Sequence, residues 1–372
     1  MNKLWIAAVT TVSALFVTSC ASVKGPLAAK QDQYASLAVV NTTVIDPENG
    51  KVLPNHSIFI KDDKILAVLP SSQPSRFRIA RTIDGTGKFA IPGLMDMHAH
   101  LFLPEPTAPS LNLLLANGVT GIREMSGDCW EVAGATTGCI QHYRALQAQI
   151  KSGAIAGPDI LRLASTMVMG PTRQKLPAGL PSFIVPTNPQ EGRSLVRYLH
   201  GRKVDLIKTH DSIPTEVFAA MMDEAGRLGV EVSGHVPFRA GLRGALTMGF
   251  KTVEHARDPL YDCSSYGPAF RKAEADAADG RKGAKRPENI IRLTRTVKEF
   301  DAGICDSAMR FFAGTGAYYV PTHVTREMEA RADEENYRKD PARQYILQDR
   351  QQRWEDDLTS TAALPLAERG AG

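Results

Sequence analysis

Short apolar runs separated by turn residues fill the chain from residue 37 onward, and their spacing changes once along the sequence. The first runs lie close together, at 37–40, 57–60 and 65–68, and a polar turn at 46–50 follows the first of them. Apolar runs of this length between turn-forming residues are typical of antiparallel strands. We therefore predict a small β-sheet element over residues 37–90.

From residue 91 the apolar runs lie further apart, with helix-like stretches such as 216–228 and 241–248 between them. Strands that alternate with helices indicate a parallel α/β arrangement, and the eight-stranded (β/α) TIM-type barrel is its nearest closed form. We find seven strand-like runs, so the predicted barrel over 91–372 is incomplete. The runs are 94–97, 119–122, 160–168, 204–207, 230–232, 250–253 and 318–320.

One segment interrupts this alternation after the sixth run. Residues 271–295 are rich in Ala, Lys, Arg and Glu. We interpret them as a solvated insert, with a lid over the site as the alternative, because charged stretches usually face solvent.

Composition indicates a folded protein without a nucleic-acid role. Of 372 residues, 43% are hydrophobic and 23% are charged, which is enough apolar material for one large or two ordinary domains. Lys and Arg number 44 against 40 Asp and Glu, and this surplus is too small for a surface that tracks phosphates. We expect a small-molecule or dipeptide substrate and no nucleic-acid partner.

The N-terminus resembles a bacterial lipoprotein signal. Lys3 precedes an apolar run at 4–17, and small residues come just before Cys20. The resemblance implies a signal peptide at 1–19, lipidation of Cys20, and a linker at 20–36. The protein would then be exported to the periplasm and held at the outer membrane by lipid chains. An ordinary secretory signal that happens to contain Cys20 is the alternative.

Export predicts disulfides among the remaining cysteines. Four of the five cysteines are left when Cys20 is set aside, an even number that suits an oxidising compartment. Pairs Cys129–Cys139 and Cys263–Cys305 are plausible, but all three pairings stay open.

Histidines gather where the predicted strands end. His98 and His100 come at the end of the first barrel strand, and alternation puts them on the same side. Lys208, His235 and His255 follow three later runs. The carboxyl ends of barrel strands are where such enzymes place their chemistry. A lone histidine there is more often a core residue, but this repetition predicts a metal site. An ammonium cannot bind a cation; the carbamate that neutral lysine forms with carbon dioxide can.

Residues 83–85 and 91–100 together resemble the opening motif of the amidohydrolase superfamily. The segments 119–124, 205–208, 233–235 and 253–255 are similar to its imidazolonepropionase-like branch, which includes Xaa-Pro dipeptidases. The resemblance covers residues 37–323.

The resemblance implies a binuclear metal centre, with zinc as the metal that imidazole and oxygen ligands suit. His98 and His100 would bind one ion, His235 and His255 the other, and carboxylated Lys208 would bridge them. A metal-bridging hydroxide would then hydrolyse a C–N bond, in an amide such as a dipeptide or an N-acyl amino acid. Lys208 and His235 are the catalytic candidates. His210, His323 and Arg123 are the substrate-binding candidates, although Arg123 and Glu124 also suit a structural ion pair.

The chain departs from this family in one respect that bears on activity. Relatives of this type carry an aspartate at the end of an eighth strand, and we find none after the run at 318–320. The residues that follow, 326–338 and 341–358, read as polar helices. We therefore expect a chain truncated at its C-terminus, with weakened or absent hydrolysis, because loss of a general acid or base costs roughly 10²–10⁴-fold in rate.

Three functions remain open at this stage. The first is a lipid-anchored amidohydrolase. The second is a non-catalytic lipoprotein that binds a ligand or a partner, which the missing aspartate favours. The third is a mononuclear deaminase or cyclic-amide hydrolase, against which Lys208 argues, because a carbamate bridge is needed where two metals bind.

Overall fold

The computed structural model describes residues 33–74, 76–101, 107–130, 138–171, 180–285, 289–333 and 335–363. The chain divides into two compact units, one that ends at Pro92 and one that begins at Gly93. The predicted signal peptide, Cys20 and most of the predicted linker lie outside the described residues. Within the described part, no helix has both the length and the apolar character needed to cross a membrane.

The first unit is a small β structure, as the apolar runs predict. Strands β2, β3 and β4 pair antiparallel in sequence order, while β6 and β7 pair parallel to β2, and β1 pairs with β5. Phe59 and Phe77 stack at 4.6 Å between ring centroids at its core. The strands are β1 (Gln33–Ala35), β2 (Leu37–Asp46), β3 (Lys51–Lys61), β4 (Lys64–Pro70), β5 (Phe77–Ile79), β6 (Thr82–Asp84) and β7 (Phe89–Ala90).

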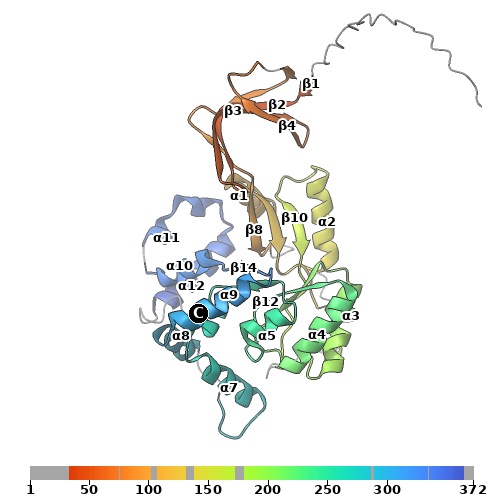
Figure 1. The fold of residues 1–372 in the computed structure, drawn as a ribbon, viewed down its shortest axis with the longest axis vertical. Coiled ribbons are helices and arrows are strands. Elements are labelled where there is room, and N and C mark those ends of the chain that lie inside the picture. Colours follow the sequence, from red (N-terminus) through yellow and green to blue (C-terminus); the bar gives the residue numbers. More distant parts are fainter. Residues whose placement is uncertain are drawn as a thin grey trace, which may run out of the picture. The chain divides into compact units, whose positions relative to one another are not determined.

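The second unit contains all seven strands that the sequence predicts, and they run parallel (Figure 1). They form two sheets, in the orders β10-β9-β8 and β11-β12-β13-β14. Two single bridges, Ala164 with Leu206 and Val168 with Thr209, join β10's continuation to β11. The strands are β8 (Leu94–Ala99), β9 (Val119–Glu124), β10 (Asp159–Leu163), β11 (Leu206–Thr209), β12 (Glu231–Gly234), β13 (Thr252–Glu254) and β14 (Tyr318–Val320).

The described strands do not close into a barrel. The outer strands β8 and β14 share no backbone pairing in the part of the chain that the structure describes. Both carry exposed apolar side chains, with Met95 63% and Tyr318 66% exposed. A closed barrel leaves no free strand edge. The expectation of an incomplete barrel therefore matches the observed strands as far as the structure describes them.

Helices cover the strands and supply most of the apolar core (Figure 1). Asn188 caps α3 by accepting a hydrogen bond from the Glu191 amide, and Gly229 ends α4 in a left-handed conformation. The helices are α1 (Thr107–Ala116), α2 (Ile140–Lys151), α3 (Pro189–Gly201), α4 (Thr215–Leu228), α5 (Gly241–Thr247), α6 (Arg257–Leu260), α7 (Gly267–Ala278), α8 (Asn289–Lys298), α9 (Ala302–Ala313), α10 (His323–Ala330), α11 (Glu335–Lys339) and α12 (Gln348–Ala362), with short 3-10 helices η1 (Ser182–Ile184), η2 (Tyr261–Cys263) and η3 (Pro341–Tyr345).

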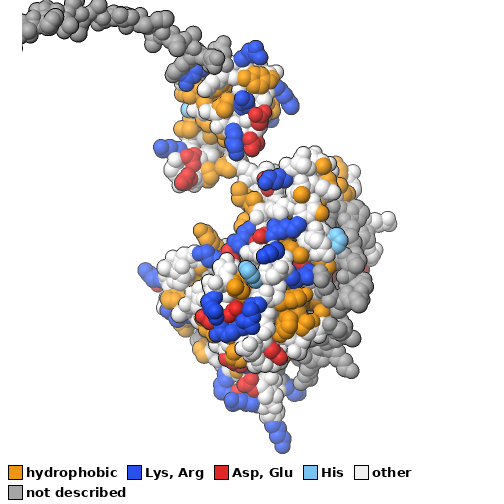
Figure 2. All heavy atoms as spheres, turned by 90° about the vertical axis from the view of Figure 1, so that its right-hand side faces the viewer, with side chains coloured by type: hydrophobic (Ala, Val, Ile, Leu, Met, Phe, Trp, Pro, Cys, Tyr) orange, Lys and Arg blue, Asp and Glu red, His pale blue; other side chains and the backbone are white. Residues whose placement is uncertain are grey.

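Two disulfides lie in the second unit, one between Cys129 and Cys139 and one between Cys263 and Cys305. Among the three pairings that the sequence left open, this is the pairing present in the structure. On the face of the second unit that Figure 2 shows, basic side chains lie in small groups with acidic ones beside them.

The charged segment at 271–295 is not simply a solvated insert, which corrects our interpretation. Its helices α7 and α8 bury Glu274, Arg292 and Leu293. The guanidinium of Arg292 lies 4.9 Å from the ring centroid of Phe238 and 5.4 Å from that of Tyr261. Cation–π contacts and the long arginine stem let a charged residue pack among aromatic rings.

Candidate functional site

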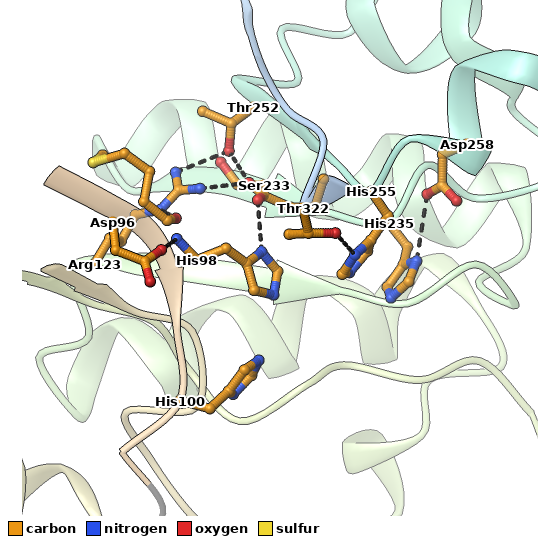
Figure 3. A network of polar contacts seen from close by, with 12 residues as sticks. Asp96, His98, His100, Arg123, Ser233, His235, Thr252, His255, Asp258 and Thr322 are labelled. Carbon is orange, nitrogen blue, oxygen red and sulfur yellow. Dashed lines mark hydrogen bonds and ion pairs between the residues drawn. The ribbon is translucent and has the colours of Figure 1, made fainter. Parts of the chain in front are cut away.

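Four histidines from three strand ends meet in the second unit (Figure 3). The ring centroid of His98 lies 5.2 Å from that of His100 and 4.7 Å from that of His255. The rings of His255 and His235 stack at 4.4 Å between centroids. Residues distant in sequence are thus brought together at the carboxyl ends of β8, β12 and β13, where the sequence analysis placed them.

Lys208 lies in β11, buried close to these histidines. Its side chain is inside the unit, with the residue 4% exposed, and burial lowers the pKa of its amino group to about 8. The same charge contributes to lowering the pKa of His98, His100 and His255. The structure therefore brings together all five residues that the sequence analysis proposed as ligands.

Three of the four rings, those of His98, His100 and His255, have a hydrogen-bonding partner at Nδ1. Nδ1 of His98 donates to Oε2 of Glu254 at 2.7 Å. The hydroxyl oxygen of Ser126 lies 2.8 Å from Nδ1 of His100, and that of Thr322 lies 3.0 Å from Nδ1 of His255. Contacts of this kind fix the ring orientation and leave Nε2 as the nitrogen that can bind a metal.

Unusual backbone conformations hold this arrangement. His255 and Thr322, which share a side-chain hydrogen bond, both have positive φ angles, of 68° and 51°. Gly234 has a φ of 130°, and a Cβ atom there would lie 2.5 Å from the carbonyl oxygen of Thr209. Backbone strain of this kind is found at functional sites, where the surrounding structure imposes it. Only glycine fits immediately before His235.

Burial keeps His98, His100 and His255 neutral. It lowers the pKa of His100 to about 3 and that of His255 to about 2, and it also lowers the pKa of His98. Neutral imidazole is the form that binds metal ions. Burial raises the pKa of Glu124 to about 7, although its two oxygens accept hydrogen bonds from the amides of Leu101 and Ser126 at 2.6 and 2.8 Å.

We expect the metal-free protein to lose stability as pH falls from about 6.5 toward 4.5. Because the pKa values of three histidines are lowered in the folded state, the unfolded chain binds protons in this pH range that the folded chain does not bind. Each of these groups lowers the free energy of unfolding by about 1.4 kcal/mol per pH unit. Glu124 has the opposite effect on the free energy of unfolding, because its raised pKa lets the folded chain bind one proton more readily than the unfolded chain. Urea unfolding at several pH values measures the slope; a flat or inverted slope contradicts the expectation.

Arg123, a substrate-binding candidate that also suited a structural ion pair, is held by groups of the protein itself. It is 2% exposed. Its Nε donates to the carbonyl of Met97 at 2.7 Å, and its terminal nitrogens donate to Thr252 and Glu254 at 3.0 and 2.6 Å. Its carboxylate partner is Glu254, not Glu124, because the Glu124 carboxylate bonds the backbone amides of Leu101 and Ser126.

The two remaining substrate-binding candidates lie in different surroundings. His210 lies beside the cluster, 4.9 Å from the ring of His235, and its Nδ1 is 2.7 Å from Oδ1 of Asp211. His323 is exposed at the first residue of α10, and in the described part of the chain no contact joins it to the four histidines. Of these two candidates, it is His210 that lies beside the cluster in the described structure.

Sequence reasoning missed two carboxylates at this site, Glu254 and Asp258. Oδ2 of Asp258 lies 3.4 Å from Nδ1 of His235 (Figure 3). Their positions in the sequence could have identified them, because Glu254 directly precedes His255 and Asp258 follows it by three residues.

The described residues include no preformed group of three or more His, Cys, Asp or Glu side chains arranged to hold a metal. The chemistry of the donors nevertheless fits one, since four imidazoles lie close together with a buried amine nearby, and Nδ1 of three of the rings has a hydrogen-bonding partner. These residues fit a metal centre that would be held through Nε2.

Comparison with known proteins gives relatives by sequence and by structure, although no family model matches the chain. Ochratoxinase of Aspergillus niger is 25% identical over 271 residues, which are 62% of this chain and 56% of the relative. The chain thus spans little more than half the length of that relative. A 5-methylthioadenosine/S-adenosylhomocysteine deaminase of Bacillus thuringiensis is 34% identical over 65 residues, 17% of this chain and 15% of the relative.

Two solved structures share the fold across most of the chain. Bottromycin amidohydrolase superposes with a TM-score of 0.55 at 20% identity, covering 90% of this chain and 62% of its own. A Xaa-Pro dipeptidase with bound methionine superposes with a TM-score of 0.50 at 17% identity, covering 90% and 86%. The chain is therefore similar in fold to these amidohydrolase and dipeptidase structures, and similar in sequence to ochratoxinase.

Proposed function

We propose that this protein is a metal-dependent amidohydrolase that cleaves the amide or peptide-like C–N bond of a small substrate such as a dipeptide or an N-acyl amino acid. The observation that carries the proposal is the meeting of four imidazoles and one buried lysine at strand ends. The similarity to ochratoxinase and to amidohydrolase structures supports it.

The lowered pKa of Lys208 supports its role as a carbamate. Burial brings that pKa to about 8, so a larger fraction of the amine is neutral near pH 7 than for an ordinary lysine. Neutral amine attacks carbon dioxide, an N–C bond forms, and one proton leaves. The product is a carbamate whose two oxygens share one negative charge, and such a group would suit two cations. The same carbamate argues against a mononuclear deaminase.

The remaining residues hold the ligands and the substrate. Zinc, when bound, lowers the pKa of a coordinated water and polarises the substrate carbonyl. His98, His100, His235 and His255 would hold the ions through Nε2. His210, beside His235 and held by Asp211, is placed to hydrogen-bond the carbonyl oxygen as its charge grows.

Substrate hydrolysis tests this function directly. The purified protein, loaded with zinc, is incubated with panels of dipeptides and N-acyl amino acids, and the released amine is measured. We expect release that a chelator abolishes and that added zinc restores. The variant His98→Ala serves as the inactive control; equal release by this variant would exclude the proposed centre as its source.

A second candidate is a protein that binds such substrates and turns them over weakly or not at all. The described residues after β14 form helices α10 to α12, and no strand that ends in an aspartate is among them. Saturable binding of a dipeptide by the zinc-loaded protein, with no amine released, would favour this candidate.

We also propose that the protein is exported and held at the membrane by lipid on Cys20. Two disulfides in the second unit suit an oxidising compartment. We expect Cys20→Ser to move the protein from the membrane fraction to the soluble fraction in cells that process lipoproteins. Unchanged membrane association would point to an anchor elsewhere.

A further inference from the structure

The segment from β13 into α6 carries two buried carboxylates, one on each side of His255. Glu254 is 0% exposed and Asp258 is 2% exposed. Each contacts a different histidine. Glu254 contacts His98 of β8, and Asp258 contacts His235, which follows β12 (Figure 3). This short stretch of chain thus reaches both halves of the histidine cluster.

Glu254 is fixed on every side. Its Oε2 accepts from Nδ1 of His98 at 2.7 Å. Its Oε1 accepts from Arg123 and from the hydroxyl of Thr252, both at 2.6 Å. Arg123 also donates to the carbonyl of Met97, the residue before His98. The carboxylate and the guanidinium therefore fix both the ring of His98 and the backbone that carries it.

Asp258 occupies the equivalent place for His235. Its Oδ2 accepts from the amide of Val236 at 3.0 Å and lies 3.4 Å from Nδ1 of His235. This Nδ1 is buried and has no hydrogen bond within the described structure. A small rotation of the ring toward Asp258 would complete one, with Nε2 on the opposite side.

We propose that Glu254 and Asp258 are positioning residues that tune the two metal positions separately, Glu254 through His98 and Asp258 through His235. Neither binds a metal itself. An anionic acceptor at Nδ1 fixes the tautomer with Nε2 unprotonated and makes the ring a stronger ligand. Loss of such a partner typically lowers metal affinity by roughly 10–100-fold. The inference rests on the proposed metal centre.

Zinc titration against a competing chelator tests the separation. The proteins compared are the wild type, Glu254→Gln, Asp258→Asn, and the control Glu224→Gln, which alters a buried carboxylate of α4 that pairs with Arg197. We expect two equivalents in the wild type and the control. Each site variant should weaken one equivalent by roughly 10–100-fold and leave the other unchanged.

Combination with ligand variants assigns each carboxylate to its position. In a His98→Ala background, Glu254→Gln should have no further effect on the remaining equivalent, while Asp258→Asn should still weaken it. In a His235→Ala background the two roles should exchange. Equal weakening of both equivalents by either carboxylate variant, or no weakening by either, would overturn the proposal.

A measurement on the unaltered protein guards against variants that do not fold. Nitrogen-15 NMR of the metal-free wild type should show both His98 and His235 protonated at Nδ1. Protonation of either ring at Nε2 would overturn the inference for that ring. A wild type that binds no zinc but shows Nδ1 protonation would refute the proposed metal centre and leave the positioning contacts standing.

Discussion

Replacement of Lys208 by alanine is expected to remove the bridging ligand and with it most bound zinc and hydrolysis. The side chain is buried beside the histidines, so an alanine leaves no anionic group between the two positions. Loss of a residue that hydrogen-bonds to a metal ligand typically lowers metal affinity or activity by roughly 10–100-fold. Loss of a direct ligand should exceed that range. Elemental analysis and amine release measure the two effects.

Small carboxylates provide a check on the carbamate itself. Acetate and formate are each smaller than the lysine side chain that is removed. Each supplies two oxygens that share one negative charge. Partial return of zinc binding to Lys208→Ala with either anion is expected. The control Lys251→Ala, at an exposed position just before β13, should behave as the wild type. Full zinc content in Lys208→Ala without added anion would exclude the bridge.

Arg123→Met is expected to destabilise the metal-free fold by about 3–5 kcal/mol, since it leaves the buried charge of Glu254 without its cation. Arg123 also holds Met97 and Thr252, so three hydrogen bonds are lost at once. The free energy of unfolding of an ordinary domain is roughly 5–15 kcal/mol, so this loss would remove a large part of it. Urea unfolding measures the difference.

Arg197→Met is the matched control, because this arginine is 46% exposed and also pairs with a buried carboxylate, that of Glu224. Glu224 keeps contacts with Arg193 and Arg227. The loss should stay below about 1 kcal/mol, as for other exposed pairs. Equal losses for the two methionine variants would show that the Arg123 network contributes no special stability.

The strands, and the histidines at their ends, were predictable because each depends on local sequence. Apolar runs at the expected spacing become β8 to β14, and a residue at a strand end is identified by its position in its own run. His98, His235 and His255 could therefore be named before any fold was known. Cysteine spacing left three pairings open because connectivity depends on distances in the folded chain.

Partners within the site depend on tertiary geometry and could not be predicted. Arg123 and Glu254 are separated by 131 positions in sequence, and only the folded arrangement of the two sheets brings them together. A neighbouring acid, Glu124, offered a simpler and incorrect partner. The composition of the segment at 271–295 predicts that Arg292 is solvated, because the segment is rich in charged residues. The aromatic rings around Arg292 belong instead to Phe238, Tyr261 and Phe270, which lie outside that segment.

The zinc content of the purified protein tests the central proposal most directly. The protein is prepared without chelators, and zinc per chain is determined by elemental analysis beside the variant His98→Ala. The four imidazoles and Lys208 predict about two zinc ions per wild-type chain, as binuclear hydrolytic sites hold, and fewer in the variant. Wild-type protein that holds no zinc, and takes up none when the metal is supplied, would contradict the proposed centre.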